Sequence, residues 1–337
     1  MKIALDAMGG DRGISVNVQG AIQACQEYPD IEVILVGDEA QIKAELSRFD
    51  ISKNCRISIH HASELVGMHE SPAESCRAKP DSSIMVCAKL HAAGTVDGLV
   101  SAGNSGATMA ASLFHLKRLE GISRPAIATI IPTMDGHCVM LDMGANVDCK
   151  PKHLVQFAVM GAVYHEAIFK SKRPTVGLLS IGEEESKGNE LTLETHQLLK
   201  ESGLNYIGNI EGRDIPIGKA DVVVCDGFVG NVVLKFAEGL AATIIKLIKG
   251  ELQGHPLAIF GGLLLKKAFK RIKKRMDPAE YGGAPLLGVN GISIVSHGVS
   301  NAVAIKNALR VASELYEDNI CDHIQKQLEK ISASVPA

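Results

Sequence analysis

Short, almost continuous apolar runs alternate along the chain with longer segments in which apolar residues recur every three or four positions. The short runs predict strands buried on both faces, and the longer segments predict amphipathic helices. The predicted strands are residues 2–7, 31–37, 56–61, 97–102, 126–131, 137–143, 175–182, 221–227 and 291–298. The predicted helices are residues 14–28, 39–48, 82–93, 107–117, 152–169, 189–202, 229–249 and 300–317. This alternation predicts an α/β protein with a mostly parallel sheet covered by helices on both faces.

One pair of predicted strands departs from the alternation. Only the segment PTMDG separates the apolar run 126–131 from the run 137–143. Because so short a connection cannot contain a crossover helix, these two strands are predicted to form an antiparallel hairpin.

Gly, Asn, Ser and Asp gather where predicted strands end. In an open α/β sheet, ligands bind at the carboxyl ends of the strands. The strand-end segments are therefore predicted to converge on one cleft. They are DAMGGD, SAGNSGA, LDMGANVD, SIGEEESKG, CDGFVGN and SHGVSN.

Two of these segments contain a Gly-x-x-Gly turn at the start of a predicted helix, at 103–106 and 227–230. Glycine lets backbone N–H groups approach a ligand, and a helix N-terminus adds unpaired donors. Asn104 and Asn231 each add an amide donor. Such turns suit a phosphate or an oxyanion, although a capped strand–helix turn has the same pattern. The presence of two such turns favours anion binding.

The segment GEEESKG at 182–188 sets three carboxylates beside Lys187. A solvated charged loop is one interpretation. In the other, Lys187 reaches an anion in the cleft and Glu183 or Glu184 orients it.

Three further charged residues have two interpretations each. Asp11 either caps the next helix or joins Asp6 in holding a divalent metal. Arg124 either binds an anion or forms a surface salt bridge.

Composition narrows the classes of protein. The net charge of −3 gives no overall reason to expect nucleic acid, and the 4% aromatic content disfavours base stacking. None of the eight cysteines forms a CxxC pair, which is typical of free thiols in a reducing cytosol. The N-terminal apolar run is too short for a signal peptide. The P-loop, GxGxxG, GxSxG and HExxH motifs of common nucleotide and hydrolase sites are missing.

Local charge is concentrated in residues 255–276, HPLAIFGGLLLKKAFKRIKKRM. Leu265, Phe269, Ile272 and Met276 form a stripe along one helical face, surrounded by Lys and Arg. A basic amphipathic helix of this kind predicts contact with an anionic membrane or an acidic protein. Packing on the protein's own core or on a second subunit is the alternative.

Taken together, the motifs resemble those of the bacterial phosphate acyltransferases. The matching segments span nearly the whole chain in the order of that family. They are IALDAMGGD, SAGNSGA, RPA, LDMGAN, LLSIGEEESKGNEL, GNIEGRD, DGFVGNVVLK, YGGAPLLGV and SHGVSN. The one departure is Ser105, where the family often has Thr and the hydroxyl is retained.

The resemblance implies a three-layer α/β/α fold like that of isocitrate and isopropylmalate dehydrogenases, with two lobes around a cleft and a homodimeric assembly. It implies that 1–337 form one unit from which an amphipathic helical hairpin, 245–278, protrudes. The implied reaction converts a fatty acyl–acyl carrier protein and inorganic phosphate to acyl phosphate and free carrier protein, in phospholipid biosynthesis.

The resemblance also implies site residues. Lys187 and Asn231 match the family's active-site positions, and no cofactor, metal or nucleic acid is expected. We expect phosphate or substrate to contact Asp6, Gly9, Gly10, Gly103, Asn104, Ser105, Gly106, Gly227 and Gly230. We expect a membrane or the carrier protein to contact Leu263, Leu264, Lys266, Lys267, Lys270 and Arg271. The protein is then expected in the cytoplasm, peripherally bound to the inner face of the cell membrane.

Three other functions fit parts of the sequence. The donor could be an acyl-CoA, as in phosphotransacetylases. A metal-dependent dehydrogenase has a similar fold. A catalytically silent scaffold on the membrane would need only the basic helix.

Overall fold

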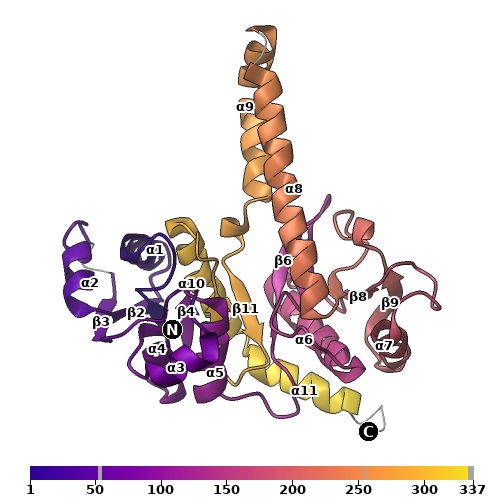
Figure 1. Ribbon diagram of the computed structural model, residues 1–337, viewed down its shortest axis with the longest axis horizontal. Coiled ribbons are helices and arrows are strands. Elements are labelled where there is room, and N and C mark those ends of the chain that lie inside the picture. The colour runs from indigo at the N-terminus through magenta and orange to yellow at the C-terminus, as the bar shows by residue number, and fades with distance from the viewer. Residues whose placement is uncertain (52–54, 254–255, 333–337) are drawn as a thin grey trace.

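Two lobes and a long helical hairpin make up the computed structural model, which describes residues 1–51, 55–253 and 256–332 (Figure 1). Each lobe is built on its own mostly parallel sheet. The predicted α/β class is therefore confirmed, and the predicted single sheet is divided in two.

The larger sheet has seven strands, and its central five strands explain the buried apolar runs of the sequence. In spatial order they are β3 (Ile57–His61), β2 (Glu32–Gly37), β1 (Lys2–Asp6), β4 (Gly98–Ser101), β12 (Ile292–Val295), β11 (Ala284–Leu287) and β5 (Ala126–Ile127). All neighbours are parallel except the pairs β12–β11 and β11–β5. The carboxyl ends of β1, β4 and β12 therefore lie at one edge.

Helices cover both faces of this sheet, because the side chains of a strand alternate between its faces. In β1, Ile3 and Leu5 enter one apolar core and Ala4 enters another. One face packs on α1 (Ile14–Glu27) and α10 (Ala302–Glu317). The other packs on α4 (Ser83–Ala92) and α5 (Ser105–His115), with α3 (Pro72–Ala78) against α5; α2 (Glu39–Leu46) packs beside α1.

The smaller sheet has five strands, with the order β6 (Thr129–Pro132), β7 (His137–Leu141), β10 (Val222–Val224), β8 (Thr175–Leu179) and β9 (Asn205–Ile210). β6 and β7 form the predicted antiparallel hairpin, and the other pairs are parallel. The long helix α6 (Pro151–Phe169) packs against β7 and β10, between α7 (Glu190–Glu201) and α11 (Ile320–Ser332).

The predicted strand 126–131 is divided between the sheets. β5 pairs with β11 of the larger sheet, whereas β6 pairs with β7 of the smaller one. Ala128 lies between them, and its N–H donates to Pro285 O. The chain thus crosses between the lobes within a segment whose sequence looks like one strand.

The projecting hairpin consists of α8 (Gly227–Gln253) and α9 (Pro256–Arg275), which run side by side away from both sheets (Figure 1). Arg275 ties its base to the β6–β7 turn by donating to Thr133 O at 2.9 Å and to Met134 O. Side chains of α8 remain largely exposed, since only 6% of its most apolar stretch is buried.

Candidate active site

The carboxylate of Asp6 organises the strand ends of the larger sheet. Asp6 ends β1 and is buried, with Oδ1 accepting from the N–H groups of Met8 and Gly9 at 3.2 and 3.1 Å. Oδ2 accepts from the Ser101 hydroxyl at the end of β4, at 2.7 Å. Burial raises the pKa of Asp6, and these hydrogen bonds partly oppose that rise.

Glycine is required where the two loops touch. A Cβ at Gly9 would lie 2.7 Å from both Gly103 N and Asp6 Oδ2. Gly10 has φ +101° and lies against Gly298 O, which accepts from Asp11 N at 2.8 Å. The segments after β1, β4 and β12 therefore converge as predicted.

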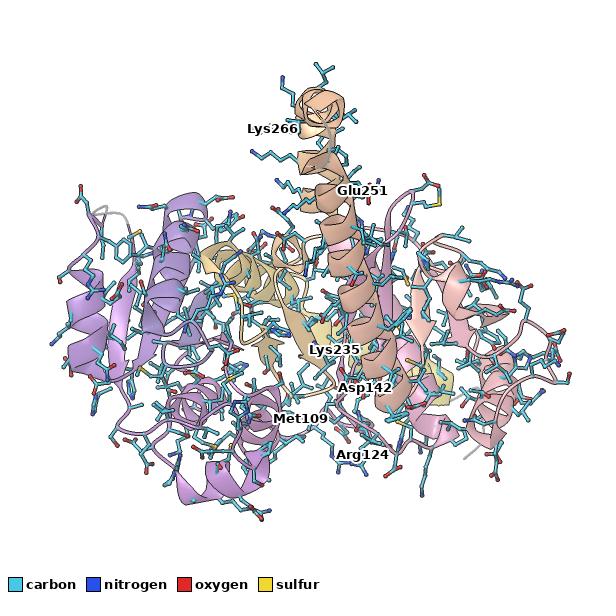
Figure 2. All side chains as sticks on the ribbon, turned by 45° about the horizontal axis from the view of Figure 1, so that its top comes forward. Met109, Arg124, Asp142, Lys235, Glu251 and Lys266 are labelled. Carbon is cyan, nitrogen blue, oxygen red and sulfur yellow. The ribbon has the colours of Figure 1, made fainter. Side chains whose placement is uncertain are left out.

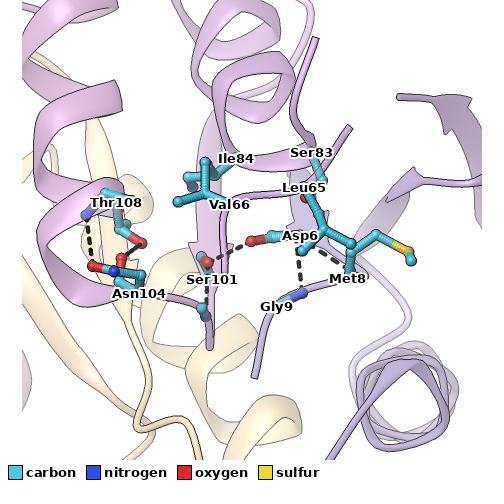
Figure 3. Close-up of a pocket in the computed structure, with 12 residues that line it drawn as sticks. Asp6, Met8, Gly9, Leu65, Val66, Ser83, Ile84, Ser101, Asn104 and Thr108 are labelled. Atoms are coloured by element: carbon cyan, nitrogen blue, oxygen red, sulfur yellow. Dashed lines mark hydrogen bonds between the residues drawn. The ribbon is translucent and has the colours of Figure 1, made fainter. Parts of the chain in front are cut away.

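A pocket opens between these loops, the segment that precedes α3 and the first turn of α4 (Figure 3). Asp6, Ser83 and Ser101 line its polar side, and the apolar side is formed by Leu65, Val66 and Ile84. Thr108 and Asn104 close it toward α5.

The N-terminus of α5 offers backbone donors. Asn104 is its N-cap and accepts from Ala107 N at 3.1 Å. Within the described residues, the N–H groups of Ser105 and Gly106 have no partner, and Ser105 is exposed. These two groups suit an anion.

We predicted that the side-chain amide of Asn104 donates to a ligand, but the structure shows that it is already engaged. Its Nδ2 donates to the carbonyls of Gly67, Met68 and Glu70, at 3.4, 3.2 and 3.1 Å. Asn104 therefore fixes the loop between β3 and α3 against α5, and the ligand donors at this turn are its backbone groups.

The structure supports neither interpretation of Asp11. The N-cap of α1 is Gly13, without a side-chain cap, so Asp11 does not cap that helix. The Asp6 oxygens already accept three hydrogen bonds from protein groups, which leaves this carboxylate poorly placed to share a metal with Asp11.

A second buried aspartate, Asp142, organises the smaller sheet's half of the site. It follows β7, and Oδ1 accepts from Ile127 N of β5 at 3.0 Å and from Ala145 N at 3.2 Å. Oδ2 accepts from the backbone N and the Nδ2 of Asn146 at 2.6 and 2.9 Å. Burial raises the pKa of Asp142, opposed by these bonds. Because β5 belongs to the larger sheet, Asp142 also joins the lobes.

The GFVG turn offers a phosphate fewer backbone donors than we predicted, because among the described residues only the Phe228 N–H of this turn has no partner. Gly227 N donates to Asn146 O, Val229 N to Asp226 Oδ1 and Gly230 N to Asp226 O, at 2.8, 2.9 and 3.0 Å. A Cβ at Gly230 would overlap Asp142 O, and one at Gly227 would lie 2.7 Å from Asp142 Oδ2. Gly227 and Gly230 therefore allow α8 to begin against the Asp142 loop.

Side chains supply the donors of this half instead. Asn231 is exposed on the first turn of α8 and packs beside Gly144. Lys187 is exposed in the loop after β8, and within the described part of the chain its ammonium has no partner. Both groups are available to a ligand.

The Lys187 loop is held from beneath. Asn209 of β9 donates to Glu184 O at 3.1 Å, and the Ser180 hydroxyl donates to Lys187 O at 3.1 Å. The buried His196 contacts both Tyr206 and Asn209 through Nδ1. Sequence reasoning missed this support, because nothing local pairs these residues with the loop.

The carboxylates of the loop do not orient Lys187 as we suggested. Glu183 pairs with Lys219 at 2.8 Å, and Glu185 pairs with Lys200 at 3.0 Å. No contact joins the Glu184 carboxylate to Lys187 among the described residues. Likewise, exposed Arg124 forms no ion pair in that part of the chain.

A further contact, between side chains, joins the two halves. Lys235 Nζ of α8 lies 3.3 Å from His297 Nε2, in the loop after β12. Both residues belong to segments that the sequence singled out, DGFVGNVVLK and SHGVSN, yet neither was predicted as a site residue. The spacing from Asn231 to Lys235, one helical turn, was the available signal.

The predicted surface residues of α9 lie away from this site. Lys266, midway along α9, is far from Lys235 and Asp142 in Figure 2. Leu264 is 72% exposed, and exposed basic residues follow it. These are Lys266, Lys267, Lys270 and Arg271. The side chain of Leu263 lies outside the described residues.

The cysteines are poor candidate nucleophiles. All eight are free thiols. Burial raises the pKa of Cys138 to about 12 and that of Cys149 to about 11, and it raises the pKa of Cys225, beside Asp142, well above the ordinary value.

The fold matches that of solved acyl-transfer enzymes. EutD phosphotransacetylase from Staphylococcus aureus has a TM-score of 0.62 at 19% identity, covering 94% of both chains. A phosphotransacetylase from Streptococcus pyogenes has a TM-score of 0.61 at 19% identity, covering 96% of this chain and 93% of that one. The chain is thus an α/β protein with the phosphotransacetylase fold.

Sequence relatives define the family. The model described as "Fatty acid synthesis protein" matches residues 1–323. The relatives named phosphate acyltransferase include one from Desulfitobacterium hafniense (strain DSM 10664 / DCB-2), 53% identical over 99% of both chains. Another, from Syntrophotalea carbinolica, is 54% identical over 97% of this chain and 93% of its own. The chain belongs to this fatty acid synthesis protein family.

Proposed function

We propose that this protein is a phosphate acyltransferase that moves a fatty acyl group from a thioester to inorganic phosphate, in phospholipid biosynthesis. The observation that carries this proposal is the full-length similarity to chains of that name, at 52–54% identity. The arrangement of donors at the strand ends agrees with it.

The reaction needs no enzyme nucleophile. A phosphate oxygen attacks the thioester carbonyl carbon, a tetrahedral oxyanion forms, and the C–S bond then breaks to release the thiolate. Buried thiols of raised pKa are unsuited to attack, and the Ser105 hydroxyl has no base within hydrogen-bond reach among the described residues. Catalysis then rests on positioning, which supplies up to about 7–11 kcal/mol of barrier reduction.

The two halves of the site divide this task. The N–H groups of Ser105 and Gly106 bind a phosphate oxygen at the N-terminus of α5. Lys187 offsets the charge of the dianion, and the Asn231 amide donates to the oxyanion. Asp6 and Asp142 hold the loops in place.

Phosphate-dependent release of thiol from a fatty acyl thioester tests the function, with ³¹P NMR identifying the acyl phosphate. Sulfate replaces phosphate in the control. Thiol release that is independent of phosphate, or an acylated side chain trapped during turnover, would contradict direct attack.

The donor we propose is acyl–acyl carrier protein. The exposed basic residues of α9 suit an acidic carrier, and those residues carry no acidic neighbour in the sequence between 266 and 275. Rates with carrier-protein and CoA thioesters of the same acyl chain distinguish the two donors. A preference for CoA would favour a phosphotransacetylase-like donor.

A second copy of the chain is the partner we propose for α8. Its exposed apolar residues recur every three or four positions and wind slowly around the helix. They include Val232, Phe236, Leu240, Ile244 and Leu247, which are 47–69% exposed. By length and composition alone α8 is apolar enough to cross a membrane. Its first turn, however, packs against the Asp142 loop, so we assign the stripe to a homodimer.

The oligomeric state tests this assignment. Phe236→Glu places a charge in the stripe and is expected to convert a dimer to a monomer in light scattering. Lys246→Gln, on the same helix, is the control. A monomeric wild-type protein would contradict the assignment.

We propose that α9 binds an anionic membrane, which places the protein peripherally on the inner face of the cell membrane. Replacing Leu263 and Leu264 with Glu is expected to release the protein from anionic vesicles and to leave turnover of a soluble donor intact. Unchanged vesicle binding would refute the proposal. A scaffold without catalysis would bind vesicles but form no acyl phosphate.

A further inference from the structure

We propose that Lys235 and His297 form a clamp between the lobes that binds a phosphate group. The inference rests on the proposed function, because it assigns part of the anion site of that reaction. It adds side-chain donors to the GFVG turn, where only the Phe228 N–H is unpaired among the described residues.

The two residues approach from opposite lobes. Lys235 lies on α8, which begins at the smaller sheet, and His297 lies in the loop after β12 of the larger sheet. Lys235 Nζ and His297 Nε2 are 3.3 Å apart, and both residues are exposed. Figure 2 shows Lys235 near the base of the hairpin, between the lobes.

The clamp has more donors than acceptors. Val299 N donates to His297 Nδ1 at 3.3 Å. A neutral imidazole has a single acceptor nitrogen, so a ring that accepts at Nδ1 carries its proton on Nε2. That N–H then faces the Lys235 ammonium, and two donors point at each other.

The one acidic neighbour does not remove this excess. Glu238 accepts from Lys235 Nζ at 2.9 Å, but an ammonium has three N–H groups. Glu238 lies on α8 three residues further on, and among the described residues it forms no hydrogen bond with His297. An anion that accepts from both nitrogens would satisfy the remaining donors.

The surroundings place that anion within the candidate active site. Lys235 is one helical turn from Asn231, on the same side of α8. His297 precedes Gly298, whose carbonyl holds the Asp11 backbone beside Gly10. A ligand on the clamp would therefore contact both halves of the site.

A phosphate group suits the clamp for two reasons. Its several oxygens accept from two donors at different angles, and charge-assisted bonds of this kind are strong. The reaction offers two sources of the group: inorganic phosphate, or the phosphodiester of the arm that carries the donor thioester.

The experiment compares Lys235→Gln and His297→Asn with two matched controls. Glu238→Gln breaks the same ion pair but keeps the Lys235 charge, and Lys246→Gln removes an exposed lysine elsewhere on α8. Calorimetry measures binding of inorganic phosphate, and of free 4′-phosphopantetheine, to each resting protein. Steady-state assays give the KM of phosphate and of the carrier thioester.

We expect Lys235→Gln to weaken the binding of one phosphate compound about ten- to hundredfold, as for loss of a charge-assisted hydrogen bond. His297→Asn is expected to weaken the binding of the same compound by a smaller factor. Both controls are expected to bind it within about twofold of wild type. If the binding of inorganic phosphate is weakened while the KM of the donor is unchanged, the ligand of the clamp is the acceptor substrate, inorganic phosphate. If instead the binding of 4′-phosphopantetheine is weakened and the KM of the carrier thioester rises, with no effect on a thioester that lacks the phosphodiester, the ligand is the arm of the donor.

Binding and KM values within twofold of wild type in both Lys235→Gln and His297→Asn would overturn the clamp. Failure of the proposed function has a different result: wild-type protein would bind phosphate but form no acyl phosphate. In that case the calorimetric comparison of the four variants still decides whether the clamp exists.

Discussion

The two halves of the candidate site use the same device for different ends. In each, an aspartate ends a strand, is buried, and accepts hydrogen bonds from a Gly-rich loop. Asp6 and Asp142 are 3% and 0% exposed, and burial raises the pKa of both.

The halves differ in what they leave available. Asp6 draws two loops together while the first N–H groups of α5 stay unpaired. Asp142 instead binds donors from its own loop and from β5, and three N–H groups at the start of α8, those of Gly227, Val229 and Gly230, are used internally. The larger sheet therefore offers backbone donors, and the smaller sheet offers the side chains of Lys187, Asn231 and Lys235.

The comparison teaches that a Gly-x-x-Gly turn at a helix start does not by itself identify an anion site. In the turn at 103–106 the glycines leave donors open, whereas in the turn at 227–230 they permit close packing. The partners of the N–H groups decide between the two roles.

The largest expected effect concerns the side-chain donors. Lys187→Ala is expected to lower kcat/KM by about 10²–10³, because the dianion and the developing oxyanion lose the cation that we place beside them. Steady-state kinetics with phosphate near saturation check this. Lys200→Ala, which removes a nearby lysine engaged with Glu185, serves as the control. Near-normal turnover of Lys187→Ala would remove Lys187 from the mechanism.

The next effect separates the two aspartates by stability. In Asp142→Asn, either orientation of the amide points its NH₂ at two N–H donors, which costs about 2–4 kcal/mol of unfolding free energy. Asp6→Asn can keep both backbone bonds on Oδ1 and donate to the Ser101 hydroxyl, so a loss of about 1 kcal/mol is expected. Urea denaturation of both variants measures the difference. Equal losses would show that the two carboxylates are equivalent supports.

The backbone donors can be tested with one residue. Ser105 is the first residue of α5, a position that tolerates proline, and Asn104 has the extended conformation that precedes proline. Ser105→Pro removes the N–H and is expected to weaken the binding of phosphate, so that the KM of phosphate rises about tenfold. Ser105→Ala keeps the N–H and is expected to stay within about threefold. If the two variants behave alike, this N–H does not bind the substrate.

The smallest expected effect is a pH dependence of stability. Because the folded pKa of Asp6 lies above the ordinary value of 3.8, ionisation costs more in the folded than in the unfolded protein. The contribution of the protonated Asp6 carboxyl to stability is complete below pH 3.8, and it is lost as the pH rises through the pKa of the folded protein.

Between pH 4 and pH 7, the unfolding free energy of wild type should therefore fall relative to that of Asp6→Asn. Denaturant melts at several pH values check it, and the subtraction cancels the other titrating groups. An opposite trend would mean that the hydrogen bonds outweigh burial.

Much of this architecture could be predicted because it is local. Short continuous apolar runs identified β1, β4, β7 and β10, and the short PTMDG connection identified the β6–β7 hairpin. Weaker segments were missed: α3 is only seven residues long, β9 has partly exposed side chains, and β11 contains a proline. Residues with catalytic roles were assigned by family resemblance rather than by periodicity.

The sequence by itself determined the α/β class, the Gly-rich strand ends and the motifs of the family, since each depends on residues close together in the chain. Only the packed chain shows that residues 126–131 divide between two sheets, that three of the four GFVG N–H groups are used internally, and that Lys235 meets His297. The physical reason is that pairing partners of backbone groups and of charges come from segments far apart in sequence, which only the packed chain brings within a few ångströms of one another.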